Sequence, residues 1–491
     1  MKHFFISVFL IISSLITFSQ SPKEEIRAAW IATNYGLDWP SKPYSNSNEI
    51  NDQQDEIIDM IDQLSRANFN MVFIQTRLRG DVIYNSKIEP VSPYIRSVEN
   101  NWSKYDPLAF TIAECHKRGL ECHAWFVTYP MGPEKVKGEE NESPALKRNK
   151  DKTKRHKGEF YLDPGNPKTN DYLVSLIEEI VKNYNIDGIH FDYVRYPDKS
   201  SDFPDDNTFK RNKRGIKTKG EWRKDNINRF IYEVYEVIKY WKPWVQVSSS
   251  VIGFYDNLPN EKRKHWTALG VSQDPENWLA AGKHDFIVPM MYYPDDLFFP
   301  FVSDWKKRSH DRHVVSGLGL FKIDAKSDNW STETIKKQIR FSRKQGLNGN
   351  AWFRSKYLIN NTKNILTELK NDLYQHPALL PPLTWLDSIP PFPPLEMEAS
   401  ISGIFLYLNW SPVLQWENEA VYYNVYRSET WPIDTSKAEN LVIARVPTRM
   451  VFLPLNTKET GYYYAVTAYD RYHNESELSD AVYFVTGPYE K

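Results

Sequence analysis

Apolar residues in the first three quarters of the chain follow two alternating periods. Short runs that are almost wholly apolar predict buried strands, and stretches with apolar residues every three or four positions predict helices. The expected strands are IRAAWIAT, NMVFIQTR, LECHAWFVTY, IDGIHFDYVRY, VQVSSSVIG, DFIVPMMYY, HVVSGLGLF and GNAWFRS. The expected helices include 53–67, 107–118, 169–184, 223–241, 332–345 and 362–373, with shorter ones near 277–281 and 298–307.

Eight strand–helix repeats predict an α/β fold, a (β/α)8 barrel of the TIM type, over residues 25–375. An open doubly wound sheet is the alternative, which is weakened because no glycine-rich phosphate loop follows the first strand. Two long charged loops, 130–159 and 198–221, leave the C-terminal ends of the third and fourth strands. The simplest interpretation is that these loops form a solvated surface. The alternative is that their excess of Lys and Arg binds an anionic polymer.

The last quarter of the chain has a different pattern. Residues 376–394 are rich in proline and predict a stiff linker without regular structure. Residues 395–488 contain short strands separated by turn signals, which predict a small all-β sandwich. Trp410, the alternation from Tyr462 to Ala468 and the segment AYDRYHNES resemble a fibronectin type III domain. This resemblance implies a spacer or adhesion module that contacts a cell surface or another domain.

The first twenty residues, 1–20, have a basic start and an apolar run from Phe4 to Phe18. The run is short for a membrane span, and polar sequence follows at once, so we expect a secretory signal peptide. No cysteine follows the run, and a lipid anchor is therefore not expected. The sequence predicts an exported protein, periplasmic or extracellular, that is not inserted in a membrane after signal cleavage.

Composition narrows the classes of partner. The formal net charge of -1 argues against nucleic acid, because phosphate binding needs a basic excess. The chain has 16 Trp, 30 Tyr and 25 Phe, and such rings suit sugar faces as well as ordinary cores. Cys115 and Cys122 fit either a disulfide or two buried thiols, and they are a poor zinc signal without a second pair.

Polar and ionisable side chains are concentrated near the C-terminal ends of the predicted strands. In GIHFDYVRYP, alternation places His190 and Asp192 on the face opposite Ile189 and Phe191. The apolar face should meet the helices, so the polar face should point into the barrel. The same count predicts a ring of polar side chains around one mouth, formed by Gln75, Arg77, His123, His190, Asp192 and Tyr292. An ion-pair cluster that closes the barrel top is the structural alternative.

Five stretches occur in a fixed order: EIRAAWIA, FNMVFIQTRLRGDVIYNSKIEPVSPYI, YDPLAFTIAECHKRGLECHAWF, YLDPGNPKTNDYLVSLIEEIV and YNIDGIHFDYVRYP. Together they resemble the glycosyl-hydrolase-like family 10, a group of exported bacterial barrel proteins, over roughly Glu25 to Leu373. The resemblance implies hydrolysis of glycosidic bonds. At least one member is described as cutting peptidoglycan strands stripped of their peptides. It also implies that the carboxylate closing the fourth strand, Asp192, is the leading catalytic candidate.

Glycoside cleavage normally uses two carboxyl groups, one as acid and one as nucleophile or base. For the partner of Asp192 we put Asp81 first and Asp295 second, ahead of Glu89 and Asp163. Asp163 precedes a proline at a helix start, where capping is its simpler role. An ion pair with a nearby arginine is the simpler role for Asp81. Attack by an acetamido group of the substrate would remove the need for a nucleophile.

The expected substrate contacts are the polar and aromatic side chains near the strand ends: Gln75, Arg77, His123, Trp125, His190, Arg195, Tyr292 and Trp352. No cofactor is expected in this interpretation, whose partner is a polysaccharide substrate. Two other functions stay open. His123, His190 and Asp192 could bind a metal in a hydrolase or deacetylase. A non-catalytic glycan-binding barrel is the other.

Overall fold

The computed structural model describes residues 21–96, 105–133, 143–259, 264–413, 419–455 and 460–486. The predicted signal peptide, residues 1–20, lies outside these ranges. Within them, no helix has both the length and the apolar character that a membrane crossing requires. Cys115 and Cys122 are both buried and free.

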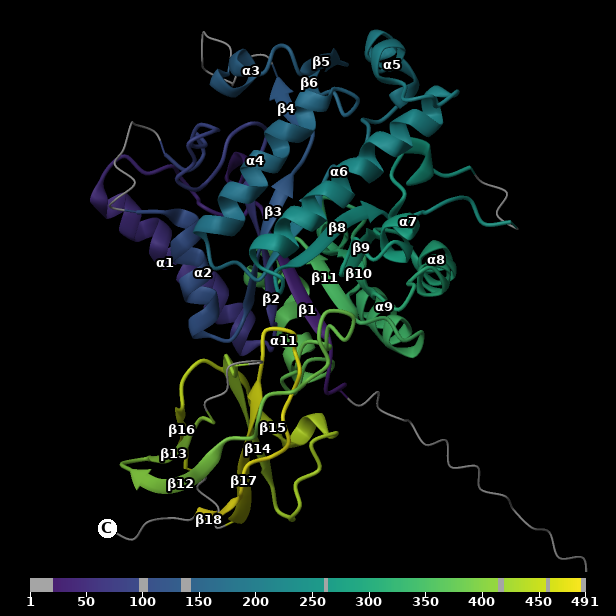
Figure 1. The fold of residues 1–491 in the computed structure, drawn as a ribbon. Helices are drawn as coiled ribbons and strands as arrows, with labels where there is room; N and C mark the ends of the chain where they lie inside the picture. Colours follow the sequence, from purple (N-terminus) through teal and green to yellow (C-terminus); the bar gives the residue numbers. More distant parts are fainter. Residues whose placement is uncertain are drawn as a thin grey trace, which may run out of the picture.

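Eight parallel strands form a closed barrel, as the hydrophobic pattern predicted (Figure 1). Their order around the barrel is β1-β11-β10-β9-β8-β7-β3-β2. The strands are β1 (Ile26–Ile31), β2 (Met71–Arg77), β3 (Glu121–Val127), β7 (Gly188–Asp192), β8 (Gln246–Ile252), β9 (Phe286–Met290), β10 (His313–Gly319) and β11 (Gly349–Phe353). Each strand is almost completely buried, because its outer face meets helices and its inner face meets the other strands.

Helices surround the barrel: α1 (Ser47–Arg66), α2 (Pro107–Lys117), α4 (Pro167–Asn183), α6 (Lys219–Trp241), α7 (Pro275–Ala280), α8 (Asp295–Lys307), α9 (Thr332–Lys344), α10 (Ser355–Ile359) and α11 (Ile365–Asn371). Several begin at a residue whose side chain accepts a hydrogen bond from a first-turn N–H, namely Asn46, Asp106, Asn166, Thr218 and Ser331. Such caps satisfy backbone donors that have no partner within the helix.

The interior of the barrel is filled by every second residue of its strands. Apolar side chains form this inner core, which includes Ile26, Ala28, Trp30, Met71, Phe73, Phe286, Val288, Val315 and Ala351. His190 lies among them, with its ring stacked on Phe73 at 4.0 Å between centroids. The lower part of the barrel is therefore packed, and a side chain near the end of a strand stands above this packed floor.

Ordered structure also occupies the two loops that the sequence left without regular elements. After β3 come β4 (Pro130–Pro133), α3 (Pro144–Arg148), β5 (Thr153–His156) and β6 (Glu159–Leu162), and the three strands form a small antiparallel sheet. After β7 comes α5 (Asp206–Asn212). Arg223 of α6 anchors this second loop through hydrogen bonds of 2.8 and 2.7 Å to Asp205. Both additions stand at the end of the barrel where the strands finish (Figure 1).

The C-terminal part is a β-sandwich, as predicted. One sheet contains β12 (Leu395–Ser402), β13 (Phe405–Ser411) and β16 (Met450–Pro454). The other contains β15 (Leu441–Val446), β14 (Tyr422–Ser428), β17 (Thr460–Tyr469) and β18 (Val482–Thr486). Trp410, Val425 and Val466 lie in the core between the sheets. The likeness to a fibronectin type III domain stays a prediction.

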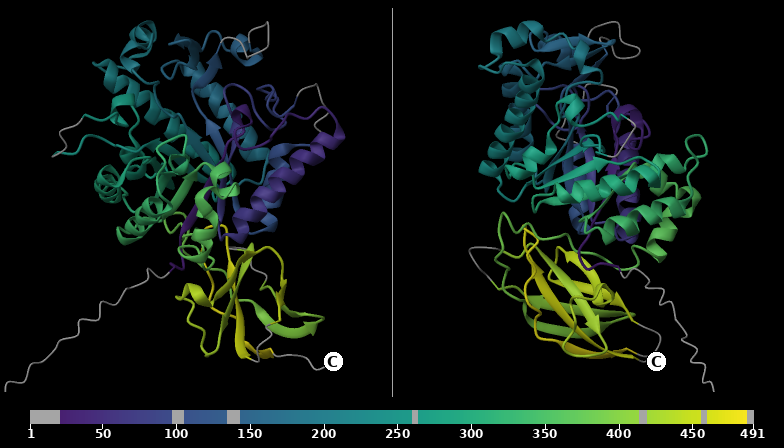
Figure 2. Two further views of the ribbon diagram at one scale, coloured as in Figure 1. Left: turned by 180° about the vertical axis from the view of Figure 1, so that it is seen from behind. Right: turned by 90° about the vertical axis from the view of Figure 1, so that its right-hand side faces the viewer.

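The sandwich packs against the end of the barrel where the strands begin (Figures 1 and 2). Glu121, at the start of β3, is the centre of this contact. One of its oxygens accepts hydrogen bonds from His473 at 2.7 Å and Arg445 at 3.2 Å, both in the sandwich. The other accepts from His123 at 3.0 Å and Gln246 at 2.8 Å, both in the barrel. One buried carboxylate thus joins the two domains.

The proline-rich segment is docked to the barrel instead of separating the domains. It has no helix or strand, as predicted, but Leu380 is buried in the inner core of the barrel. The backbone of Leu379 pairs with Lys23 and Glu25, and Trp385 donates to the Asp285 carboxylate at 2.9 Å. The segment therefore links the two domains while it is itself packed against the barrel. Its apolar residues close the base of the barrel and fix the sandwich beneath it.

We expect Arg445→Met to lower the free energy of unfolding by about 3–5 kcal/mol, because it leaves the Glu121 carboxylate buried without its arginine. Burial alone would raise the pKa of Glu121, but the charges of His473 and Arg445 outweigh it and hold that pKa well below its ordinary value. The stability from this cluster is therefore present at neutral pH and is lost as the pH falls through the lowered pKa.

Denaturant titration at pH 7 measures this effect. Arg427→Met is the matched control, because Arg427 lies in the same sandwich, is only partly buried and packs over the Tyr462 ring. The free energy of unfolding of Arg427→Met should fall by less than about 1 kcal/mol. Equal losses in the two variants would contradict the role assigned to the Glu121 cluster.

Candidate active site

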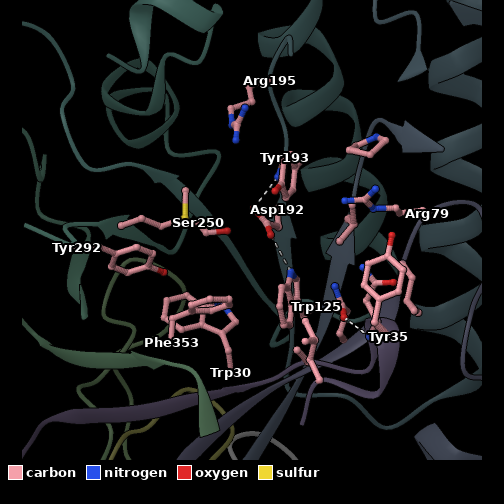
Figure 3. Close-up of a pocket in the computed structure, with 18 residues that line it drawn as sticks. Trp30, Tyr35, Arg79, Trp125, Asp192, Tyr193, Arg195, Ser250, Tyr292 and Phe353 are labelled. Carbon is pink, nitrogen blue, oxygen red and sulfur yellow. Dashed lines mark hydrogen bonds between the residues drawn. The ribbon is translucent and has the colours of Figure 1, made fainter. Parts of the chain in front are cut away.

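A pocket of about 360 Å³ opens at the C-terminal end of the barrel, the end that carries the active site in barrel enzymes. Figure 3 shows its lining, with Asp192 near the centre. The lining residues are Trp30, Ala32, Asn34, Tyr35, Leu37, Gln75, Leu78, Arg79, Trp125, Val127, Pro130, Asp192, Tyr193, Arg195, Ser250, Met290, Tyr292 and Phe353. Of the expected contacts, Gln75, Trp125, Arg195 and Tyr292 meet there with Asp192.

Asp192 is the last residue of β7 and is only 7% exposed. Its Oδ2 accepts a hydrogen bond from the Trp125 indole at 3.2 Å, and its Oδ1 accepts one from the Tyr193 backbone N–H at 2.7 Å (Figure 3). Both donors are uncharged. They fix the direction of the carboxyl group and leave it facing the pocket.

Tyr193 ends the strand and turns into the pocket. Its φ of 52° is left-handed, a conformation that breaks the β pattern directly after Asp192. The side chain is 39% exposed, and its ring lies 4.7 Å from the Arg195 guanidinium. The same guanidinium lies 4.9 Å from the Trp266 ring. Arg195 is thereby held between two aromatic rings at the rim.

Burial sets the electrostatics of the Asp192 carboxyl. Desolvation raises its pKa above the ordinary value, because water no longer stabilises the charged form. The Arg195 charge and hydrogen bonds from Ser250, Tyr193 N–H and Trp125 oppose this shift without cancelling it. Burial raises the pKa of Tyr292 well above 10, and the nearby Asp192 charge adds to that rise. A carboxyl group with a raised pKa can act as a general acid.

Aromatic rings form one wall of the pocket. Tyr292 stacks on Phe353 with 5.8 Å between centroids, and Trp30 meets the edge of Phe353 at 6.1 Å. Gly319 permits this arrangement, because a Cβ there would lie 2.8 Å from the Tyr292 Cβ. Flat apolar rings beside hydrogen-bonding groups suit the faces and hydroxyls of a sugar.

The two histidines lie below the pocket and not around its mouth. The His190 Nδ1 pairs with the Ser248 hydroxyl at 2.9 Å, and burial holds the pKa of His190 well below its ordinary value. His123 lies at the barrel base beside Glu121. Their inward direction was predicted correctly, but they sit too early in their strands to reach the opening. Nothing in the described ranges groups three side chains suited to hold a metal ion, so the metal interpretation has no assembled site there.

Arg77 points away from the pocket, contrary to expectation. The pairing of β2 with β3 shifts between Gln75 and Arg77, so Thr76 is an extra residue in a bulge. Arg77 then faces outward, where it forms a buried salt bridge of 2.7 Å to Glu89. Gln75, before the bulge, keeps its inward direction. Its Oε1 accepts from the N–H groups of Thr33 and Asn34 at 3.0 and 2.8 Å and so fixes the loop after β1.

Trp352 and Asp295 also lie outside the lining of the pocket. Trp352 faces the helices and donates to the Tyr374 hydroxyl at 3.1 Å, and the next residue, Phe353, occupies the pocket instead. Asp295 begins α8, where Gln338 lies 3.5 Å from its carboxylate. Asp163 serves the turn before α4, accepting from Gly165 N–H at 3.0 Å and from the Thr208 hydroxyl.

Sequence reasoning missed Trp30, Tyr35, Arg79 and Phe353 as lining residues. Trp30 and Phe353 share the inward face of β1 and β11 with Ala28 and Ala351, so the same parity count could have found them. Tyr35 and Arg79 come from loops. The polar and aromatic run TNYGLDW directly after β1 was the available signal for Tyr35.

Residues 25–313 match the sequence profile of the family described as "Glycosyl hydrolase-like 10". The chain belongs to this family. It is 32% identical over 501 residues to the glycosyl hydrolase YngK of Bacillus subtilis (strain 168), with 96% of each chain covered.

Two further comparisons are more distant. The glycosyl hydrolase DigH of Escherichia coli (strain K12) is 29% identical over 376 residues, which is 69% of this chain and 85% of that one. The solved structure of alpha-L-fucosidase isoenzyme 2 from Paenibacillus thiaminolyticus is 12% identical, with a TM-score of 0.49 over 72% of this chain and 49% of that one. The family match and the closed barrel together make the chain a glycosyl-hydrolase-like barrel protein.

In this glycosyl-hydrolase-like barrel, Asp192 is the only carboxylate among the described residues that line the main pocket. Asp81 lines a smaller pocket beside it, on the other side of Arg79. Glu89 forms a buried salt bridge with Arg77 and does not line the main pocket. The lining therefore brings together one acid, aromatic rings and two arginines, Arg79 and Arg195.

We expect Arg195→Met to raise the pKa of Asp192 further, because it removes a favourable positive charge. A native pKa above the unfolded value means that the folded protein binds the extra proton, so stability falls as the pH rises between the two values. Because the native pKa of Asp192 is higher in the variant, its stability continues to fall up to a higher pH than that of the wild type. Carboxyl-carbon NMR titration measures the pKa directly. Arg211→Met, an exposed arginine on α5, is the control, and an unchanged Asp192 pKa in Arg195→Met would contradict the assignment.

Proposed function

We propose that the protein is an exported glycoside hydrolase that cleaves O-glycosidic bonds of a polysaccharide, with peptidoglycan strands stripped of their peptides as the first substrate to test. The observation that carries this proposal is Asp192, a buried carboxyl with a raised pKa in a pocket walled by aromatic rings. Membership of a glycosyl-hydrolase-like family supports the reaction class. Export rests on the basic and apolar start of the sequence.

Asp192 supplies the acid in this reaction. Its raised pKa favours the protonated form, which donates its proton to the glycosidic oxygen as the bond to the anomeric carbon breaks. The resulting carboxylate then accepts a proton from the water that completes hydrolysis. Trp125 and the Tyr193 N–H hold the two oxygens in place through both steps.

The group that attacks the anomeric carbon is the second requirement. Because Asp192 is the only carboxylate among the described lining residues, we assign this step to the acetamido oxygen of the substrate. Such substrate-assisted catalysis is an established exception to the two-carboxylate rule. The sugars of peptidoglycan strands carry acetamido groups, and the oxazolinium formed by their attack is opened by water with overall retention of configuration.

We expect Asp192→Asn to lower the rate of strand cleavage by at least about 10³-fold, because the amide cannot donate the acid proton. Release of soluble fragments from peptide-free peptidoglycan, followed by chromatography, measures the rate. Asp295→Asn is the matched control. It removes a carboxylate at the same end of the barrel but outside the lining, and its rate should stay within about threefold of wild type.

Three outcomes separate the alternatives. Equal product from wild type and Asp192→Asn would refute the role of Asp192. Binding of strands by wild type without any product would favour the non-catalytic glycan-binding barrel. A product with inverted configuration would exclude acetamido attack while leaving the acid role of Asp192 intact.

A further inference from the structure

A second, smaller pocket of about 170 Å³ adjoins the main pocket on the side of β2. The two pockets share three lining residues, Asn34, Tyr35 and Arg79, so they are neighbouring parts of one cleft. Figure 3 shows Tyr35 and Arg79 on one side of Asp192, away from Tyr292 and Phe353. A ligand that passes Tyr35 and Arg79 therefore reaches the smaller pocket from the larger one.

Asp81 lines this smaller pocket and has an unused oxygen. It follows β2 in a tight reversal, in which the Leu78 N–H donates to the Asp81 backbone carbonyl at 2.9 Å. The carboxyl Oδ1 is enclosed and has no hydrogen-bond partner among the described residues. A buried polar atom without a partner is costly. The Asp81 side chain as a whole is only partly buried, and its accessible part lines the smaller pocket.

The neighbouring cations are engaged elsewhere. Arg77 is paired with Glu89 at 2.7 Å, and Arg79 is paired with Glu159 at 2.9 Å. In the described part of the chain, no basic side chain forms an ion pair with Asp81, so the simple ion-pair role expected from the sequence is not observed. The carboxyl group is held in the pocket by the fold and not by a partner charge.

Burial is the main influence on the protonation of the Asp81 carboxyl. Burial raises its pKa to about 7, and the Glu89 carboxylate adds to the rise. A hydrogen bond from Ser92 and the charges of Arg77 and Arg79 oppose it. The neutral carboxyl presents one O–H donor and one acceptor, a pair that suits sugar hydroxyls and amides better than cations.

Aromatic hydroxyls complete the pocket. The Tyr35 and Tyr94 rings meet edge to face with 5.1 Å between centroids, and both line it. Burial raises the pKa of Tyr94 to about 12, with smaller contributions from Tyr35 and Asp81, so its hydroxyl stays a donor. The pocket thus combines rings and neutral hydrogen-bonding groups without a free charge among the described lining residues.

We propose that the pocket at Asp81 is a second sugar subsite, in which the Asp81 carboxyl hydrogen-bonds a hydroxyl or acetamido group of the sugar next to the one at Asp192. This assignment rests on the proposed function, because it needs a sugar in the main pocket. It makes Asp81 a binding residue that selects for chain length. The sequence places Asp81 first among candidates for the second catalytic carboxylate, and the subsite gives it a binding role instead.

The test uses full-length protein that carries Asp192→Asn, so that substrate is bound and not consumed. Peptide-free peptidoglycan fragments of one and four sugars are titrated by calorimetry. Adding Asp81→Leu should weaken binding of the four-sugar fragment, which reaches both pockets, about tenfold or more, and should leave the one-sugar fragment, which fills the main pocket alone, within about twofold. Asp59→Leu, an exposed aspartate on α1, is the control and should change neither affinity.

A second variant, Asp81→Asn, keeps a donor and an acceptor but does not titrate. Affinity of the parent for the four-sugar fragment should fall as the pH rises above about 7, because the carboxyl loses its proton, while that of Asp81→Asn should stay level. Thermal melting confirms that each variant is folded. This variant keeps the test decisive if Asp81→Leu fails to fold.

Each remaining result has a defined meaning. Parent-like affinities in folded Asp81→Leu, equal losses for both fragments, the same pH dependence in Asp81→Asn, or no binding of either fragment by the parent would overturn the subsite. Asp81-dependent binding in a protein whose wild type releases no product would support the subsite and overturn the proposed hydrolase function alone.

Discussion

The alternation of side chains across the wall of a closed barrel is the constraint on which the rest of the molecule depends. Only every second residue of a strand can face inward, and the lower interior is already filled by residues such as Trp30, Phe73 and His190. Asp192 is the last inward position of β7, directly above this packed floor. The same position removes it from bulk water and still leaves it open to a ligand. Asp192 is both buried and accessible to a ligand because it occupies the last inward position of its strand.

Two buried carboxylates at opposite ends of the barrel show how neighbouring groups determine the pKa of a carboxyl. Glu121 meets His473 and Arg445, whose charges hold its pKa low, and it joins the two domains. Among the described residues, the hydrogen bonds to Asp192 come from neutral donors, and the Arg195 charge does not offset burial, so its pKa rises. Desolvation acts on both groups. The difference lies in the paired positive charges, which lower the pKa of Glu121 and form no salt bridge with Asp192 among the described residues.

The eight barrel strands and the inward direction of Asp192, Gln75 and Trp125 were predictable, because period-two patterning is a local property. Arg77 was not, since the bulge at Thr76 depends on pairing with β3 and has no mark in the sequence. Tyr35 and Arg79 come from loops whose path is set by distant contacts, such as the bonds from the loop after β1 to Gln75. Parity predicts which way a strand residue faces, but it does not predict where the chain leaves that pattern.

The closed base determines how a polymer can approach Asp192. Leu380 is packed into the inner core and the sandwich lies beneath it, so a chain cannot pass through the barrel. A polymer that reaches the pocket must lie across its mouth. On one side, Tyr35 and Arg79 lead to the pocket of Asp81. Arg195, above Asp192 in Figure 3, rests on Trp266, which lines a separate pocket. A ligand of Asp192 therefore enters from the C-terminal end of the barrel, with the pocket of Asp81 on one side of it.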